Sequence, residues 1–440
     1  MSLLDADLGE GRGWAKVGDG YAVTKKPRSL DRTKFPAIPF AAMEAIPQGG
    51  SYLPDFVMKP GDAISSGTYF ERGDVLVGKI TPSFENGKQA LMQDLSAPFG
   101  YATTEVIPLH PISDRHDPRF LFFYLLHPDV RHYVAERMEG STGRQRVPES
   151  VLLDLPIPEL EPEEQTAVAD AIETLHKAIS AEAACEKTAR DFKLAAMRAL
   201  FTKGLRGEAQ KETEVGPVPE SWEIKSLGTH FSVVSGGTPS RSNPTFWHGG
   251  EIPWAKTTEV NYCVIRETEE HITPAGLIGS AAKLLPPGTL LMAMYGQGVT
   301  RGKVAILGTE AACNQACAAI RPSSGAIETK FLYHFLVSRY EEIRQLAHGG
   351  QQQNLNLEIV RGLSVCFPPE KAEQNEIVAI LDAIDRKIDL HRRKRALLDE
   401  LFKALLHKLM TGEIRVSDLD LSALSSDPVS AAKQTPEVAA

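Results

Sequence analysis

The sequence is short of three things: cysteine, long apolar runs and positive charge. Its five cysteines in 440 residues are too few and too scattered to form a disulfide framework. Cys313 and Cys317 lie close together, but no second Cys or His pair completes a zinc site, so buried reduced thiols are expected. The longest apolar runs, such as Leu121–Leu126 and Leu290–Tyr295, are far too short to span a membrane. The acidic Met1–Trp14 stretch has no apolar segment of the secretory type, which predicts a cytoplasmic protein.

The shortage of positive charge bears on nucleic-acid binding. Lys and Arg number 48 against 57 Asp and Glu, for a net charge of −9. None of the regions defined below is basic overall, so strong sequence-independent attraction to phosphates is not expected from this chain alone. Either nucleic acid is not the ligand, or a partner protein supplies much of the phosphate affinity. The local basic group best suited to phosphates consists of Lys25, Lys26, Arg28, Arg32 and Lys34.

Motifs that would hold a cofactor or carry a reaction are incomplete. Asn243–Phe246 is similar to the Asn/Asp-Pro-Pro-aromatic loop of amino-methyltransferases, but a threonine replaces the second proline and no glycine-rich cofactor loop accompanies it. The glycine spacing in Gly296–Lys303 is one residue too long for a phosphate-binding loop. The pair Glu223 and Lys225 lacks the second acid that a nuclease site needs. We therefore predict no catalytic residue, no metal site and no cofactor bound by this chain.

The chain contains two copies of one unit. Residues 70–90 and 285–305 align without gaps at an offset of 215. The identical matched positions are Gly73 and Gly288, Leu76 and Leu291, Gly87 and Gly302, Lys88 and Lys303, and Ala90 and Ala305. Further matches are Trp14–Gly18 with Trp222–Gly228, Arg119–Leu126 with Lys330–Val337, Gly140–Gln145 with Gly349–Asn354, and Pro162–Gln165 with Lys371–Gln374. Matches that keep the same order along the chain indicate a tandem duplication, and two copies are too few for a solenoid.

Each copy follows the same plan of elements. A stretch rich in Gly, Pro and short apolar runs predicts irregular β structure with turns. A short helix follows, around Phe120–Leu126 or Phe331–Val337, and then a polar glycine-rich loop and one long helix that opens after prolines. The sequence therefore predicts an α+β protein formed by tandem duplication of a β-rich domain, with a long helix after each copy. The expected regions are a first domain at 1–158, a first long helix and linker at 159–214, a second domain at 215–366, a second long helix at 367–418, and a disordered tail at 419–440.

Both long helices carry a heptad seam. In the second helix the seam contains Ile377, Leu381, Ile384, Ile388, His391, Arg395, Leu398, Phe402, Leu405 and Leu409. In the first helix it contains Val168, Ile172, Leu175, Ile179, Glu182, Glu186, Ala189, Lys193, Ala196 and Leu200. The seams are apolar toward their ends and polar in the middle, which favours pairing of the two helices as an antiparallel coiled coil. Glu182 and Glu186 would then face Arg395 and His391. The alternative is that each helix merely covers its own domain.

Five stretches in this order resemble the DNA-specificity subunits of type I restriction–modification systems. They are Leu155–Pro158 with Glu163–Gln165, Val218–Glu223 with Leu227–Gly228, Ser235–Ser240, Gly249–Trp254, and Gln351–Leu355. The resemblance covers nearly the whole chain, although the first domain lacks the Gly-Gly-Thr-Pro opening. It implies a non-catalytic subunit whose two target-recognition domains read a bipartite, asymmetric site in double-stranded DNA. It also implies partners: two modification subunits that bind S-adenosylmethionine and methylate adenines, and restriction subunits that act as motor and nuclease.

The residues expected to contact DNA lie in polar loops and turns. The sequence predicts hairpin tips at Glu85–Lys88 and Thr300–Lys303, where glycine permits the turn and a lysine or arginine reaches phosphate. Glutamine and asparagine can bond adenine edges, and arginine can read guanine. The DNA-binding candidates are Lys25, Lys26, Arg28, Lys88, Arg144, Gln145, Arg146, Arg241, Ser242, Asn243, Lys256, Arg301, Lys303, Gln351, Gln352, Gln353 and Asn354. For the hairpin cations and the polar loops, the alternative is a solvated side chain or one that bonds its own backbone.

Two other functions stay open at this point. One is a self-sufficient DNA methyltransferase or nuclease with a degenerate site, which the missing cofactor loop disfavours. The other is a structural scaffold whose two β-rich domains on a helical stalk bind protein and not DNA. Specific binding of a bipartite duplex, lost when one half-site is altered, would exclude the scaffold.

Overall fold

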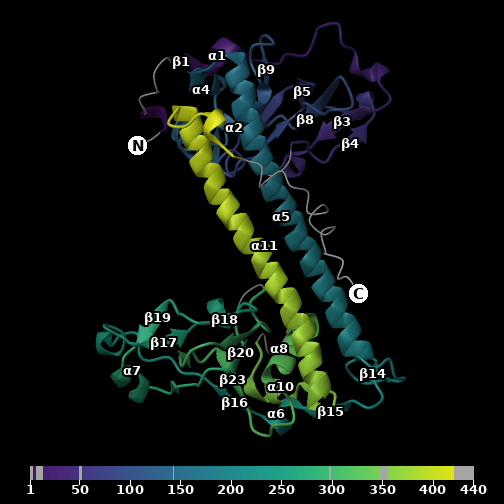
Figure 1. Cartoon of the computed structure of the whole chain (residues 1–440), viewed down its shortest axis with the longest axis vertical. Helices are drawn as coiled ribbons and strands as arrows, with labels where there is room; N and C mark the ends of the chain where they lie inside the picture. The colour runs from purple at the N-terminus through teal and green to yellow at the C-terminus, as the bar shows by residue number, and fades with distance from the viewer. Residues whose placement is uncertain are drawn as a thin grey trace, which may run out of the picture. The chain divides into compact units, whose positions relative to one another are not determined.

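The computed structural model describes residues 3–5, 13–48, 52–141, 143–296, 299–346 and 354–420. It consists of two compact units, one formed by Met1–Cys185 with His391–Ala440 and the other by Glu186–Leu390. Two long helices, α5 (Pro162–Lys203) and α11 (Lys371–Thr411), belong to both units, because each unit boundary falls inside one of them (Figure 1). The first unit therefore contains the start of α5 and the end of α11, and the second unit contains the remainder.

The first unit contains two four-stranded sheets, with the orders β2-β9-β6-β7 and β4-β3-β8-β5. Their strands are β2 (Tyr21–Val23), β3 (Ile38–Ala41), β4 (Val57–Lys59), β5 (Thr68–Glu71), β6 (Val75–Gly78), β7 (Gln89–Leu91), β8 (Phe99–Ala102) and β9 (Val106–Pro111). Two further strand pairs are β1 (Gly13–Lys16) with β12 (Pro156–Glu159), and β10 (Glu139–Ser141) with β11 (Arg144–Arg146). The short helices are α1 (Val17–Gly20), α2 (Pro118–Tyr124), α3 (Pro128–Ala135) and α4 (Glu149–Leu153). The 3-10 turns are η1 (Leu3–Asp5), η2 (Arg32–Lys34), η3 (Met43–Ala45), η4 (Gly61–Ala63) and η7 (Val416–Asp418).

The second unit contains a five-stranded sheet, β16-β23-β20-β21-β18, and a three-stranded sheet, β19-β17-β22. Their strands are β16 (Phe231–Ser235), β17 (Ile252–Ala255), β18 (Val264–Ile265), β19 (Glu270–Ile272), β20 (Leu290–Ala293), β21 (Val304–Leu307), β22 (Ala312–Cys313) and β23 (Cys317–Pro322). Two further pairs are β13 (Gln210–Lys211) with β14 (Val218–Pro219), and β15 (Glu223–Ser226) with β24 (Ser364–Phe367). The short helices are α6 (Leu227–His230), α7 (Pro274–Ile278), α8 (Thr329–Ser338), α9 (Tyr340–Gln345) and α10 (Leu357–Gly362), with 3-10 turns η5 (Pro244–Phe246) and η6 (Thr257–Glu259).

The two units share most of their strand topology; β18 in the second unit and β5 in the first have no counterpart in the corresponding sheet. The order β2-β9-β6-β7 in the first unit corresponds to β16-β23-β20-β21 in the second. In the other sheet, β3 pairs with β8 in parallel and with β4 antiparallel, and β17 pairs in the same way with β22 and β19. The pair β1·β12 likewise corresponds to β15·β24. This agreement confirms the predicted α+β class and tandem duplication, including the short helices α2 and α8.

Matched glycines mark equivalent turns in the two copies. Gly73 and Gly288 have φ angles of +94° and +85°, and Gly87 and Gly302 have φ angles of +80° and +87°. Glycine adopts this left-handed conformation at low cost, whereas a side chain would strain it. The identities found in the sequence alignment therefore reflect backbone geometry that both copies need.

A buried glutamine fixes the start of each long helix. The Gln165 carboxamide accepts from the Asp117 backbone N–H at 3.2 Å and donates to the Leu160 carbonyl at 2.8 Å. Gln374 accepts from the Glu328 N–H at 2.8 Å and donates to two carbonyl oxygens, both at 2.9 Å. Asp117 and Glu328 are the N-cap residues of α2 and α8. The matched glutamine of the two helix starts thus joins the long helix to the short helix of its own copy.

The long helices pack against each other within each unit. In the first unit, Ile172 and Leu175 of α5 share a core with Leu398 and Leu405 of α11. In the second unit, residues near the end of α5, including Phe201, share a core with Ile377 near the start of α11. The start of one helix therefore pairs with the end of the other, which is the antiparallel arrangement, and the predicted pairing of the two helices is confirmed.

Cysteine burial and the composition of the helices bear on the expectations drawn from the sequence. Cys313 and Cys317 are buried free thiols, as expected. A hydrogen bond between them, together with burial, raises the pKa of Cys317 well above its usual value. Within the described ranges, no helix combines the length and the apolar composition that crossing a membrane requires.

Candidate nucleic-acid interface

A two-stranded ribbon projects from the first unit where the sequence placed Arg144, Gln145 and Arg146. Strands β10 and β11 pair antiparallel in the register Glu139 with Arg146 and Ser141 with Arg144. Every described residue of the ribbon is exposed except Gln145, which is half-buried. Because side chains alternate along a strand, Arg144 and Arg146 share one face and Gln145 occupies the other. A two-stranded β-ribbon of this kind fits the major groove of B-DNA.

The ribbon is fixed to the body of the unit through its second strand. The Thr81 N–H donates to the Gln145 carbonyl at 3.0 Å, and the Val147 N–H donates to the Lys79 carbonyl at 2.8 Å. The Gln145 carboxamide faces the Met138 carbonyl at 3.5 Å. Gln145 was expected to bond an adenine edge, but in this structure its side chain points toward its own backbone. The arginine face is left as the solvent-facing side of the ribbon.

Arg146 is bound by a carboxylate of its own unit. Its Nε and Nη2 donate to the two oxygens of Glu105 at 2.9 and 2.8 Å. Glu105 is the residue before β9, and its hydrogen bond with Arg146 lowers the pKa of its carboxyl. Arg144 is exposed and forms no ion pair with any part of the chain that the structure describes.

The cations that were expected at the two hairpin tips bond or pack against their own unit instead of extending into solvent. The strand pairs β6·β7 and β20·β21 do form antiparallel hairpins. However, Lys88 is half-buried and its Nζ donates to the Met43 carbonyl at 2.5 Å, and Arg301 is only 9% exposed. Lys303 donates to the Asn261 side chain at 2.8 Å. The physical reason is that Lys88 finds an acceptor on a neighbouring segment of its own unit and that Arg301 is packed away from solvent. Reach toward phosphate from Lys88 and Arg301 is not supported by their placement.

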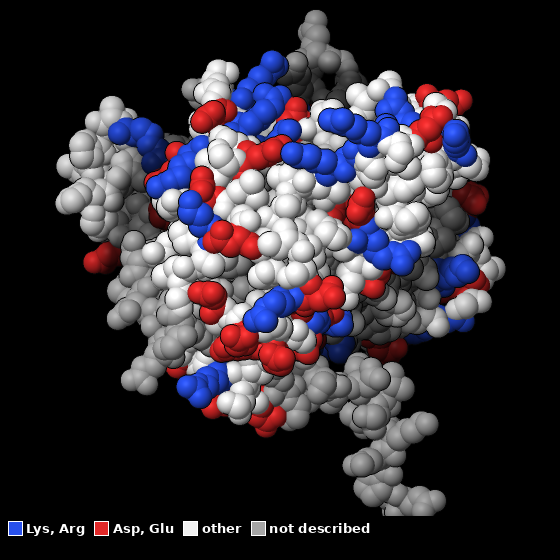
Figure 2. Space-filling view, turned by 90° about the horizontal axis from the view of Figure 1, so that it is seen from above, with Lys and Arg blue, Asp and Glu red and all other residues white. Residues whose placement is uncertain are grey.

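The exposed basic group near the start of the chain keeps its predicted character. Lys25, Lys26 and Arg28 are all exposed and form no ion pair within the described residues. They follow β2 directly in the first unit. Figure 2 shows one face of the molecule, on which Lys and Arg side chains are interspersed with Asp and Glu. This mixed distribution of charge agrees with the sequence, in which none of the regions has a net positive charge.

In the second unit, the Gly-Gly-Thr-Pro loop is packed tightly against the neighbouring strands. A Cβ on Gly236 would lie 2.2 Å from the Cys313 carbonyl oxygen, so only glycine fits. The Gly237 N–H donates to the Cys313 carbonyl at 2.9 Å, and the Gly237 carbonyl accepts from Trp254 Nε1 at 2.9 Å. The loop therefore holds the following residues, among them Arg241, in a defined position.

Arg241 and Lys256 share one acidic partner. The Arg241 guanidinium lies 3.7 Å from the centre of the Trp247 ring and bonds Glu270. The Lys256 Nζ lies 3.0 Å from Glu270 and 2.7 Å from Glu269. The hydrogen bond from Arg241 lowers the pKa of Glu270 and outweighs its burial, with Lys256 adding to the effect. These predicted DNA contacts thus gather around one carboxylate beside an aromatic surface.

The other candidates of the second unit divide into described and undescribed residues. Asn243 caps η5, since its Oδ1 accepts from the Thr245 N–H at 3.1 Å, which explains the Asn-Pro start of that motif. Ser242 is exposed, and its hydroxyl lies 2.8 Å from that of Ser240. Asn354 is exposed. Gln351, Gln352 and Gln353 lie outside the described residues.

The polar middle of the helix pair contains an ion cluster. Glu182 of α5 bonds His391 at 2.6 Å and Lys394 at 2.5 Å, both on α11 in the same unit. These two hydrogen bonds, with charge attraction, lower the pKa of Glu182 against the effect of its burial. In the second unit, Lys193 bonds Asp385 at 2.6 Å. Sequence reasoning placed Glu182 near His391 and put Lys193 on the seam of the first helix, but it did not select Lys394 or Asp385, which lie beside the seam.

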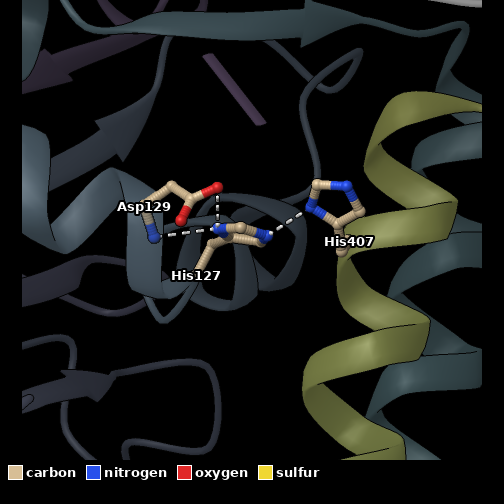
Figure 3. Close-up of side chains that lie close together, drawn as sticks. All are labelled: His127, Asp129 and His407. Carbon is tan, nitrogen blue, oxygen red and sulfur yellow. Dashed lines mark hydrogen bonds and ion pairs between the residues drawn. The ribbon is translucent and has the colours of Figure 1, made fainter. Parts of the chain in front are cut away.

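Two groups in the described residues place three metal-type donors close together, His127–Asp129–His407 and His334–Asp382–Asp385. In the first group, the Asp129 N–H donates to His127 Nδ1 at 3.1 Å, so the proton lies on Nε2, which faces His407 Nδ1 at 3.3 Å (Figure 3). In the second, Asp382 bonds Lys330 and His334, and Asp385 bonds Lys193. These donor atoms already bond protein partners, so we interpret both groups of residues as structural contacts.

The histidine pair predicts a pH-dependent stability for the first unit. Burial lowers the pKa of His127 from its usual 6.5 to about 4, with His407 adding to the shift and Asp129 opposing it. A lowered folded-state pKa stabilises the fold above pH 6.5, and this stability is lost as the pH falls toward 4. Between pH 6.5 and 5, we expect a loss of about 1–2 kcal/mol in the free energy of unfolding.

Chemical denaturation at pH 7.5, 6.5 and 5.0 measures this loss. The control variant His127→Asn keeps an oxygen that can cap the Asp129 N–H but does not titrate. It should lose less stability than the native chain over the same range. Equal losses in the two proteins would contradict a role for His127.

These features define a class of protein: a duplicated α+β subunit with two β-rich units on paired helices and no complete catalytic motif. The family model described as the type I restriction modification DNA specificity domain matches residues 219–400. The putative MjaX specificity subunit of Methanocaldococcus jannaschii is 23% identical over 355 residues, which is 78% of this chain and 79% of that protein. The MjaIX specificity subunit of the same organism is 27% identical over 213 residues, 46% of this chain and about half (48%) of that protein.

A solved structure has the same fold. The S subunit of a type I restriction–modification system from M. genitalium has a TM-score of 0.59 at 14% sequence identity, covering 93% of this chain and 99% of that one. The chain is therefore similar to type I restriction–modification specificity subunits along most of its length, and residues 219–400 match the family's DNA specificity domain.

Proposed function

We propose that this chain is the DNA-specificity subunit of a type I restriction–modification complex. It is non-catalytic, reads a bipartite and asymmetric target in double-stranded DNA, and assembles with modification and restriction subunits in the cytoplasm. It binds no cofactor, because S-adenosylmethionine is held by the modification subunits. The observation that carries this proposal is the repeated topology: the strand order β2-β9-β6-β7 of the first unit recurs as β16-β23-β20-β21 in the second, so the chain has two recognition domains of one plan.

The difference between the units supports an asymmetric target. After β2 the first unit carries the exposed Lys25, Lys26 and Arg28, whereas after β16, the corresponding strand, the second unit carries the Gly-Gly-Thr-Pro loop with Arg241 stacked on Trp247. A single recognition domain that contacts a few base pairs loses about 1–3 kcal/mol of binding free energy for each mismatched pair, so its specificity for one sequence is limited. Linking two domains raises their joint affinity through effective concentration. Two different recognition domains in one chain therefore recognise a longer DNA sequence that is divided into two parts.

The helices supply surfaces for assembly. In the first unit, Leu397 and Leu401 of α11 are 67% and 46% exposed. In the second unit, Phe192 and Leu194 of α5 are 62% and 55% exposed. Leu397 and Leu401 lie one turn apart on one face of α11, and such a pair suits docking of a partner helix, whereas Phe192 and Leu194 lie two positions apart and point to different faces of α5. Modification subunits bound there would also supply the phosphate contacts that a chain of net charge −9 lacks.

A domain exchange tests the proposal. Replacing residues 215–366 with the equivalent domain of a relative should change one half-site of the methylated sequence and leave the other unchanged, because each domain has its own core. The measurement is mapping of methylated adenines across the genome of cells that carry the chimera. A chimera that alters both half-sites, or a native complex that methylates no bipartite sequence, would contradict independent readout.

A further inference from the structure

The ion pair between Arg146 and Glu105 has a particular geometry. Glu105 receives the Nε–H and one Nη2–H of the guanidinium, which together form its side edge. An arginine has five N–H donors in a planar fork. The end edge, with one N–H on Nη1 and one on Nη2, is therefore not used by Glu105. The Arg146 side chain remains 52% exposed while its plane is held in place.

The two partners are fixed by different elements of the same unit. Glu105 stands at the start of β9, and its carbonyl accepts from the Lys79 N–H at 2.9 Å. Arg146 ends the exposed strand β11, whose backbone forms a β-bridge at Ile80. The carboxylate thus belongs to the sheet and the arginine to the ribbon. Loss of side-chain freedom has already occurred before DNA binds, which reduces the entropic cost of a directed contact.

Guanine is the base that matches a preorganised end edge. In the major groove it presents two adjacent acceptors, O6 and N7, and two parallel N–H groups of arginine bond both. Adenine replaces one acceptor with a donor, and cytosine presents a donor, so each leaves an N–H of the fork without a partner. An arginine held by a carboxylate cannot turn away to satisfy itself elsewhere without breaking that pair.

We propose that Arg146, held by Glu105, is a specificity-determining residue of the first unit and reads a guanine in its half-site. Glu105 is a positioning residue, since it acts through Arg146. The inference rests on the proposed function. Arg144, on the same ribbon face, has no ion pair within the described residues and contacts phosphate in this scheme.

The test uses the full complex and the target found by methylation mapping. Arg146→Gln should weaken binding to the mapped duplex by about tenfold to a hundredfold, the range expected for one bidentate base contact. It should also remove the guanine requirement at one position of one half-site. Arg144→Gln is the matched control, because it removes the same charge from the same ribbon face. It should weaken binding to the mapped duplex and to a random-sequence duplex to a similar degree, with the methylated sequence unchanged.

Glu105→Gln tests the positioning role separately. Loosening Arg146 should relax the guanine preference while steepening the salt dependence of random-duplex binding by about one unit, as the freed arginine reaches a phosphate. Glu161→Gln is its control, because Glu161 pairs with Arg115 on the same unit at 3.1 Å, and it should change neither property. Native-like base preference in both Arg146→Gln and Glu105→Gln, with bipartite methylation intact, would overturn this inference and leave the proposed function standing. Absence of bipartite methylation by the native complex would overturn both.

Discussion

Leu398→Asp should destabilise the first unit by about 3–5 kcal/mol, because it places an unpaired charge in a packed core. Leu398 is 7% exposed and belongs to the core that also contains Ile172 and Leu175 of α5. We expect the melting temperature to fall by roughly 10 °C. The modification subunits should also fail to co-purify with the variant.

The adjacent residue provides a control on the same helix. Leu397 is 67% exposed, so Leu397→Asp adds the same charge without entering the core. Its melting temperature should stay within about 2 °C of the native value, because surface substitutions change stability little. If Leu397 belongs to the docking surface, co-purification of the modification subunits weakens while thermal stability is retained. A stable, fully assembling Leu398→Asp complex would show that the helices do not depend on each other.

The parts of the fold that follow from local patterns were predictable. Heptad spacing predicted the helix pair, and the matched glycines predicted equivalent turns, since both depend on side-chain type at a fixed position. The role of Gln165 and Gln374 was not predicted. Their sequence context indicates only the start of a helix, whereas their partners, such as the Glu328 N–H, come from a segment more than forty residues away.

The candidate interface was less predictable for the same reason. Lys88 and Lys303 are matched by sequence, yet one bonds the Met43 carbonyl and the other the Asn261 side chain. Glu105 was missed as the partner of Arg146 because the two lie 41 positions apart. A residue type indicates which bonds a side chain can make, but the tertiary fold decides which acceptors come within reach.

Lengthening both helices should move the two half-sites apart. An insertion near the end of α5, such as after Thr202, would be absorbed by the following linker, because Phe201 is the last buried residue of the helix and the helix ends at Lys203. The better positions are the unit boundaries, after Cys185 in α5 and after Leu390 in α11. Inserting the same number of residues into both helices preserves the residue pairing between the antiparallel helices.

Four residues added at each of these boundaries lengthen an α-helix by about 6 Å and leave about 40° of residual rotation. B-DNA advances about 3.4 Å and turns about 35° per base pair. The translation therefore corresponds to nearly two base pairs and the rotation to about one. We expect the same two half-sites, separated by one or two more unspecified pairs, in the methylation map of cells that carry the variant. Insertion into α5 alone is the control, since an unmatched segment bulges out and leaves the spacing unchanged. Undiminished methylation at the original spacing in the double insertion would show that helix length does not set the distance between half-sites.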